Sequence, residues 1–315
     1  MSNKINVVAI VGPTAAGKTK LAIEIAKKIK AEIINADSMQ VYKGMNIGTA
    51  KPSKAERDNI PYHLIDVVDN KQNFNLADYV KLAHNKIDEV YRLGKLPMLV
   101  GGTGLYIDAV LKNFQLDVLP ENKEVRDLLK QKSEQNGQEY LFNELKTLDS
   151  KAAEKIGSNN VKRIIRALEI NYLKGKNLDE CYLETQSNGV PYNSIIFGLN
   201  YKNRDVLYEN INKRVDEMVA KGLVEEVESL LKEGLSKTAG QAIGYKEFQN
   251  YFFGNESLEN VVNNIKQSTR KYAKRQLTWF KKNKEIIWID IDEYRNFGEI
   301  LNFCLEVLEK YKLIW

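Results

Sequence analysis

The sequence has few of the residues that build metal centres and disulfide frameworks. It contains only two cysteines, Cys181 and Cys304, and two histidines, His63 and His84, spread along 315 residues. These numbers exclude a disulfide-stabilised framework, and the spacing excludes a zinc site made of cysteines and histidines. Isolated cysteines are typical of a reducing compartment, so we predict a cytoplasmic protein.

Long apolar segments are also missing. No run approaches the roughly 20 apolar residues that a membrane helix requires, so we expect no membrane association. The short apolar run at residues 7–11 leads directly into a glycine-containing motif. We therefore interpret it as a strand and not as the core of a signal peptide.

Negative charge is missing from one segment near the C-terminus. Residues 260–284 contain eight lysines and arginines and no acidic residue, which leaves −3 for the remainder of this +5 chain. On a helix, most of these cations form two adjacent rows: Arg270, Lys274 and Lys281, and Lys271, Arg275 and Lys282. Two parallel rows suit a phosphate backbone, although a solvated helix face would show the same pattern.

Short apolar runs alternate with amphipathic runs in the N-terminal third of the chain. Strands are expected at residues 6–11, 32–36 and 96–100, and helices at residues 18–29 and 75–91. Short, fully apolar strands that alternate with helices indicate a parallel sheet covered on both faces.

The pattern changes in the middle of the chain. Residues 121–189 contain strong helix signals and no convincing strand, whereas strands return at residues 194–199 and 286–291. We therefore predict an α/β fold, with a parallel sheet flanked by helices and a small all-helical insertion domain. The core would comprise residues 1–120 and 190–315, and the insertion would comprise residues 121–189.

A phosphate-binding motif, GPTAAGKT, lies between the first predicted strand and the first predicted helix. It fits G-x-x-x-x-G-K-[ST] in full, and its residues are Gly12, Pro13, Thr14, Ala15, Ala16, Gly17, Lys18 and Thr19. Backbone amides and the helix N-terminus would surround the phosphates, Lys18 would neutralise them, and the Thr19 hydroxyl would bind Mg²⁺. A chance glycine-rich turn is the alternative, which the flanking strand and helix disfavour. Taken alone, the loop indicates ATP or GTP binding.

Two further groups follow strands and should reach the same sheet edge. Asp37 and Ser38 come directly after the second predicted strand, and the sequence GGTG at residues 101–104 follows the third. A nucleotide hydrolase usually carries a metal-directing acid at the latter place, and this sequence has none there. We infer that Asp37 is the candidate base at this edge, although an aspartate before serine is also a common turn cap.

A second basic helix is predicted within the insertion. Val161, Ile164, Leu168 and Tyr172 form its expected buried stripe, while Lys162, Arg163 and Arg166 project elsewhere. Two basic helices could bind an extended polyanion between them, whereas a small phosphorylated molecule needs one such site. RNA or DNA is therefore the expected partner.

An ordered set of motifs between residues 12 and 280 resembles the bacterial tRNA dimethylallyltransferase family. These motifs are GPTAAGKT, INADSMQVYKGMNIGTAKP, HLID, GGTGLY, KRIIRALE, RVDEMVAKGLVEEV, QAIGYKE and RKYAKRQLTWF. The resemblance implies a P-loop NTPase-like core that uses Mg²⁺. It implies transfer of a dimethylallyl group from dimethylallyl pyrophosphate to the exocyclic amine of the adenine 3′ of the tRNA anticodon. A monomer is expected.

The same resemblance assigns roles to individual residues. It implies that Asp37 is the general base with Thr103 beside it, and that Arg214 joins the loop in holding pyrophosphate. The tRNA contacts implied by the motifs and by the basic rows are Asp37, Ser38, Met39, Gln40, Thr103, Arg126, Lys162, Arg163, Arg166, Gln241, Gly244, Tyr245, Arg270 and Lys274. Two positions depart from the family pattern: Tyr62 stands where a histidine is expected, and Lys271 stands where glutamine is commoner.

Two other functions share some of these features. A small-molecule P-loop kinase would place ATP in the loop and use Asp37 to activate a hydroxyl group. An RNA-binding switch would use the loop only to sense nucleotide. The kinase would not need the basic rows, and the switch would not need Asp37.

Overall fold

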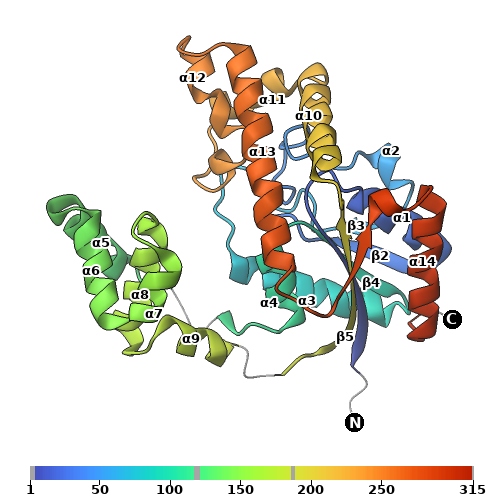
Figure 1. Cartoon of the computed structure of the whole chain (residues 1–315), viewed down its shortest axis with the longest axis horizontal. Helices are drawn as coiled ribbons and strands as arrows, with labels where there is room; N and C mark the ends of the chain where they lie inside the picture. Colours follow the sequence, from blue (N-terminus) through green and yellow to red (C-terminus); the bar gives the residue numbers. More distant parts are fainter. Residues whose placement is uncertain (1–3, 117–120, 186–188, 314–315) are drawn as a thin grey trace. The chain divides into compact units, whose positions relative to one another are not determined.

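A computed structural model of the chain describes residues 4–116, 121–185 and 189–313. The chain forms two compact units, one made of residues 1–111 with 191–315 and the other of residues 112–190. The first unit contains the sheet, and the second consists of helices (Figure 1). The domain boundary predicted at residue 120 lies outside the described residues.

The first unit is built on a six-stranded sheet with the order β3-β2-β4-β1-β5-β6, in which all neighbouring strands are parallel. The strands are β1 (Ile5–Val11), β2 (Ala31–Asn35), β3 (Tyr62–His63), β4 (Leu96–Gly101), β5 (Tyr192–Asn200) and β6 (Ile286–Asp290). The predicted parallel α/β sheet is thus confirmed. The sequence did not predict β3, because a strand of two residues has no detectable periodicity.

Helices cover both faces of this sheet. The helices of the first unit are α1 (Lys18–Lys28), α2 (Lys54–Arg57), α3 (Leu76–Arg92), α4 (Gly104–Leu111), α10 (Arg204–Ala220), α11 (Leu223–Glu233), α12 (Gln249–Phe252), α13 (Leu258–Phe280) and α14 (Phe297–Lys310). No helix in the described part of the chain is both long enough and apolar enough to cross a membrane.

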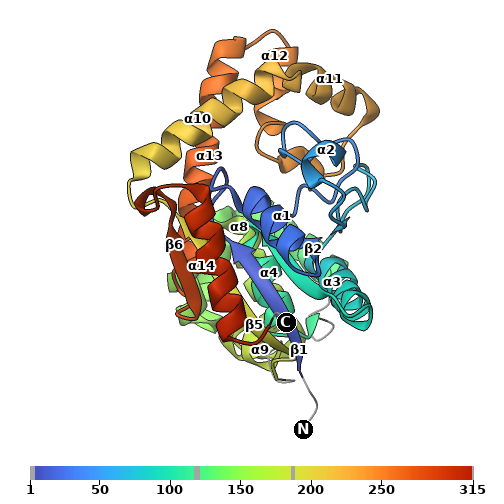
Figure 2. The ribbon, with the colours of Figure 1, turned by 90° about the vertical axis from the view of Figure 1, so that its right-hand side faces the viewer.

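The pleat of β1 distributes its buried side chains between two layers. Val8 and Ile10 belong to the core under α1 and α14, two helices that pack against each other (Figure 2). Val7 and Ala9 are equally buried and point to the opposite face, where α3 and α4 pack. Burial on both faces explains why the strand sequence is continuously apolar.

A third group of helices extends the first unit beyond the strand ends. Helix α13 packs along α10, and a hydrophobic cluster joins these helices with α11 and with the loop that follows β2 (Figure 2). Val41, Met45, Val215, Val227 and Ile265 are buried in this cluster. The loop after β2 is therefore fixed by apolar packing.

The second unit contains α5 (Lys123–Asn136), α6 (Gln138–Leu148), α7 (Ser150–Ile156), α8 (Val161–Lys174) and α9 (Leu178–Thr185). Ile164 and Leu168 of α8 lie in its core, as their spacing predicted. The prediction that Tyr172 is buried is wrong, since its side chain is 37% exposed. Its hydroxyl instead donates to Glu144 at the surface of the unit.

One buried carboxylate links two helices of the second unit. Glu169 is 0% exposed and accepts hydrogen bonds from Arg126 Nε at 3.0 Å, Arg166 Nη1 at 2.6 Å and the Asn122 amide at 2.7 Å. It therefore joins α8 to the start of α5. A buried charge needs such partners, because desolvation without them is costly.

We predict that Glu169→Gln loosens the second unit selectively. The amide cannot serve two guanidinium groups as the carboxylate does, and we expect a loss of about 1–3 kcal/mol of local stability. Hydrogen exchange of the full chain should then accelerate in α5 and α8 and stay unchanged in β1. Glu154→Gln on α7 is the matched control, since Glu154 is exposed. Equal protection of α5 and α8 in both variants would contradict the structural role of Glu169.

Candidate active site

Parallel pairing brings the ends of three strands to one edge of the sheet. Val11 pairs with Gly101, and Asn35 pairs with Val100. The phosphate loop, Asp37 and the turn at residues 101–104 therefore begin side by side, as the rule for ligand sites in α/β sheets predicts.

The phosphate loop has a backbone that only certain residues adopt easily. Gly12, Ala15 and Gly17 have φ values of 140°, 62° and 76°. A Cβ atom at position 12 would lie 2.5 Å from the Leu199 carbonyl oxygen, so this site requires glycine. Gly17 then leads directly into α1, whose N-terminus faces the loop.

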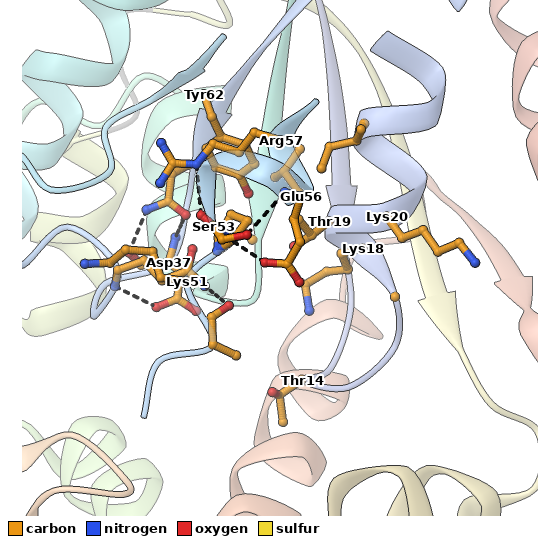
Figure 3. Close-up of a pocket in the computed structure, with 18 of the residues that line it drawn as sticks. Thr14, Lys18, Thr19, Lys20, Asp37, Lys51, Ser53, Glu56, Arg57 and Tyr62 are labelled. Atoms are coloured by element: carbon orange, nitrogen blue, oxygen red, sulfur yellow. Dashed lines mark hydrogen bonds between the residues drawn. The ribbon is translucent and has the colours of Figure 1, made fainter. Parts of the chain in front are cut away.

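A cavity of about 1090 Å³ lies at this edge. Figure 3 shows Lys18 and Thr19 at the start of α1, and Asp37 across the pocket from them. The lining includes these predicted site residues: Thr14, Ala15, Ala16, Gly17, Lys18, Thr19, Asp37, Gln40 and Arg214. It also includes Lys51, Arg57, Tyr62, Lys221 and Gln276, to which the sequence assigned no role in the pocket.

Two partly buried cations, Lys18 and Arg214, line the pocket. Burial lowers the pKa of the Lys18 ammonium to about 7, the charge of Arg214 acts in the same direction, and Asp37 opposes both. Among the described residues neither cation forms an ion pair, and Lys18 Nζ donates to the Pro13 carbonyl at 2.6 Å. The pocket therefore favours an anionic ligand, which would offset the cost of holding both charges.

Asp37 lies just beyond the end of β2. Its Oδ1 accepts the backbone amides of Met39 at 2.9 Å and Gln40 at 3.4 Å, so it does cap a turn. Asn35 holds the same segment through a 3.2 Å hydrogen bond from the Asp37 amide. These contacts orient the carboxylate on the pocket wall, and the turn-capping and catalytic interpretations are therefore compatible.

Thr103 lies next to this segment. Its Oγ1 accepts the Ser38 amide at 3.1 Å and donates to Ser38 Oγ at 3.4 Å. Tyr272 of α13 is also close: burial and the charge of Asp37 raise the pKa of its hydroxyl, and hydrogen bonding to Thr103 opposes them. The turn after β4, the segment after β2 and α13 thus meet around Asp37.

Two of the residues predicted to contact tRNA have buried side chains that hydrogen-bond within the protein. Gln40 is 7% exposed, and its amide donates to the carbonyls of Thr49 and Ala50. Tyr245 is 1% exposed and donates its hydroxyl to Glu226 at 2.7 Å. Gln40 also lines the cavity, whereas Tyr245 does not, and contact of either side chain with tRNA stays a prediction.

Glu226 was not predicted from the sequence, although it organises the loop after β2. Its carboxylate accepts the consecutive backbone amides of Asn46, Ile47 and Gly48 at 2.8–3.0 Å. The QAIGYKE motif, which contains Tyr245, supplies two more predicted tRNA contacts: Gln241 is exposed, and the Gly244 amide donates to Glu247. No sequence signal pairs a helix glutamate with a loop about 180 residues away.

Helix α13 does not present all its cations to solvent. Arg270 donates to Asn212 of α10 at 2.6 Å, and Lys266 forms an ion pair with Asp216, also of α10, at 2.6 Å. Lys271, Lys274 and Arg275 are exposed. The exposed face therefore combines members of both predicted rows.

The four basic candidates in the second unit also differ in environment. Lys162 and Arg163 are exposed on α8. Arg126 and Arg166 bind the buried Glu169, so part of their charge is already neutralised. Lys162 and Arg163 are accordingly the stronger candidates for contacting a polyanion.

The pocket fits Mg²⁺ only as a partner of bound phosphates. Within the described ranges, no cluster of three histidine, cysteine or acidic side chains could hold a metal ion. Mg²⁺ usually keeps several waters and binds one or two protein oxygens together with substrate phosphates. The Thr19 hydroxyl on the pocket wall fits such a site.

Comparison with known protein families gives two overlapping matches. The family described as IPP transferase matches residues 40–283, and the family described as isopentenyl transferase matches residues 5–69. The chain is 47% identical over 309 residues to a tRNA dimethylallyltransferase of Thermoanaerobacter sp. (strain X514), covering 96% of this chain and 98% of the relative. It is 44% identical to that of Halalkalibacterium halodurans, covering 98% and 99%.

Solved structures give the same result. The tRNA isopentenylpyrophosphate transferase of Bacillus halodurans superposes with a TM-score of 0.71 at 43% identity, covering 98% of this chain and 99% of that one. A eukaryotic dimethylallyltransferase acting on tRNA superposes with a TM-score of 0.76 at 30% identity, covering 90% and 73%. The chain therefore belongs to the tRNA dimethylallyltransferase family.

Proposed function

We propose that the protein transfers a dimethylallyl group from dimethylallyl pyrophosphate to the exocyclic amine of the adenine 3′ of the tRNA anticodon. The observation that carries this proposal is one cavity lined by Lys18, Arg214 and Asp37, in which the charge of Asp37 acts on both cations. A cationic wall suits a leaving pyrophosphate, and a carboxylate across from it suits an amine that must lose a proton.

Departure of pyrophosphate is the step that the loop would assist. An allylic carbon tolerates positive charge, so bond breaking becomes easier as the developing anion is stabilised. Lys18, Arg214 and the loop amides supply preorganised positive charge for this purpose. When bound at Thr19 and the phosphates, Mg²⁺ would add Lewis-acid stabilisation.

Activation of the adenine amine is the role proposed for Asp37. An aromatic amine is a weak nucleophile until a base accepts its proton. The backbone amides of Met39 and Gln40 hold the carboxylate in place, and Thr103 fixes the adjacent segment through Ser38. Asp37 would accept the proton as the nitrogen–carbon bond forms.

The adenine must leave the anticodon stack to reach this cavity. Ligand pockets commonly measure about 300–1,000 Å³, and this one, at about 1090 Å³, offers room for a flipped base beside a prenyl chain. Recognition would rest on the single-stranded loop and its unstacked bases. The exposed face of α13 would contact tRNA phosphates, as would Lys162 and Arg163.

The remaining features of the proposal follow from this activity. The enzyme would act in the cytoplasm, where tRNA is found, as a monomer with Mg²⁺ as its cofactor. A kinase is the second candidate because the loop fits a nucleotide equally well. The exposed cations of α13 favour the transferase, since a small-molecule kinase gives them no role.

A transfer assay tests the proposed function. Incubation with labelled dimethylallyl pyrophosphate, Mg²⁺ and unmodified tRNA should release pyrophosphate and label one adenine next to the anticodon. Asp37→Asn, which keeps the shape and loses the base, should lower the single-turnover rate by about 10²–10⁴-fold. Its tRNA affinity should stay within a few-fold of wild type.

Two outcomes would count against prenyl transfer with Asp37 as the base. Turnover of ATP with no prenyl transfer would favour the kinase. Normal turnover by Asp37→Asn together with a large loss of tRNA affinity would reassign Asp37 from catalysis to binding.

The exposed face of α13 gives a separate prediction about tRNA binding. Replacing Lys271 and Lys274 by Ala removes two cations, so tRNA affinity should fall and its dependence on salt should weaken by about one to two counterions. Lys81→Ala with Lys310→Ala is the matched control, because both lysines are exposed on other helices. An unchanged salt slope in the α13 variant would show that this face is merely solvated.

A further inference from the structure

Gln276 is a buried polar residue that links α13 to the phosphate loop. It is 4% exposed, and its Oε1 accepts the Thr14 amide at 2.9 Å. Its Nε2 donates to the Gly102 carbonyl at 2.9 Å. One side chain therefore joins the loop after β1 to the turn after β4, and both hydrogen bonds have good length.

The turn after β4 is shaped to receive this face of α13. A Cβ atom at Gly102 would lie 2.0 Å from Gln276 Nε2, and one at Gly104 would lie 2.2 Å from Trp279 Cδ1. Trp279 Nε1 in turn donates to Asp108 of α4 at 2.8 Å. The two glycines thus allow α13 to approach closely enough for Gln276 to reach both backbones.

The loop needs such support because it contains a strained residue. Ala15 has a φ of 62°, a left-handed conformation that residues with a Cβ seldom adopt. Strained backbone persists only where its surroundings fix it. Gln276 holds the amide of Thr14, the residue that directly precedes Ala15.

We propose that Gln276 is a positioning residue that holds the phosphate loop in its anion-binding conformation before the ligand arrives. This inference rests on the proposed function, because it concerns the same pyrophosphate site. Since the Thr14 amide is already engaged, the amides that receive the phosphates would be those of residues 15–19. Gln276 would act through these groups and would not touch the reacting atoms.

The same helix carries the cations proposed to contact tRNA. Lys271 and Arg275 are exposed, whereas Gln276 faces inward. The residue that orders the pyrophosphate site thus belongs to a rigid element whose other side is proposed to meet the second substrate. A single helix would set the distance between the two substrates.

Titration with inorganic pyrophosphate and Mg²⁺ tests the proposal without relying on transfer activity. Gln276→Met keeps the approximate shape and removes both hydrogen bonds, and we expect pyrophosphate affinity to fall about tenfold. The affinity for an anticodon stem-loop RNA should stay within about twofold. Gln72→Met is the matched control, because Gln72 is exposed and lies neither in the cavity lining nor on α13, so both affinities should stay unchanged.

The outcomes separate this inference from the proposed function. If wild type binds pyrophosphate and Gln276→Met binds it equally well, the positioning role is overturned while the transferase proposal stands. A parallel loss of RNA affinity would show a general structural defect and would also overturn it. If wild type does not bind pyrophosphate at all, the proposed function itself fails.

A second measurement covers the case in which Gln276→Met does not fold. Amide hydrogen exchange of ligand-free wild type should be slow at Thr14 and fast at Ala16 and Gly17. Pyrophosphate should then slow exchange at Ala16 and Gly17 alone. Fast exchange at Thr14 before ligand is added would overturn the proposal.

Discussion

Parallel pairing of β1, β2 and β4 is the constraint on which the site depends. Because Val11 pairs with Gly101 and Asn35 with Val100, three chain segments leave the sheet at the same level. None of these segments forms a pocket alone. The cavity arises where they meet, and α13 packs on the turn after β4, where Gly102 and Gly104 leave room for Gln276 and Trp279. The sheet therefore fixes where these three segments begin, and helices α10 and α13 complete the site.

Electrostatics then decides what this geometry is suited to bind. A phosphate loop, a lysine with a lowered pKa and a nearby arginine would serve a nucleotide or a prenyl pyrophosphate equally well. The two kinds of site differ in where the carboxylate lies. No acid follows β4, and Asp37 lies after β2 instead, across the pocket from Lys18. That position suits the proposed deprotonation of an incoming nucleophile better than direction of a metal.

The sequence predicted those parts of the structure that are local or periodic. The apolar strands, the phosphate loop and the family motifs can each be recognised from residues that are close in the sequence. The structure contains the strands near their predicted positions. The sequence alone did not reveal contacts between segments that are distant along the chain. It placed Arg270 in a solvent-facing row because helical angles do not reveal that Asn212 of α10 lies alongside. It assigned no role to Gln276 or Glu226, since neither hydrogen-bonding partner is near in sequence. The short β3 was missed for lack of any periodic signal. Tyr172 fits the periodic stripe of α8, yet it lies at the surface, where its hydroxyl donates to Glu144.

The central claim is that the loop grips the pyrophosphate of a leaving group, with the reacting carbon directed toward Asp37. A crystal structure with Mg²⁺ and an unreactive thio analogue of dimethylallyl pyrophosphate tests it most directly. We expect Lys18 to leave the Pro13 carbonyl, now 2.6 Å away, and to bind the phosphates together with Arg214. The first prenyl carbon should then face Asp37. Phosphates bound elsewhere, or a prenyl chain directed away from Asp37, would contradict the account.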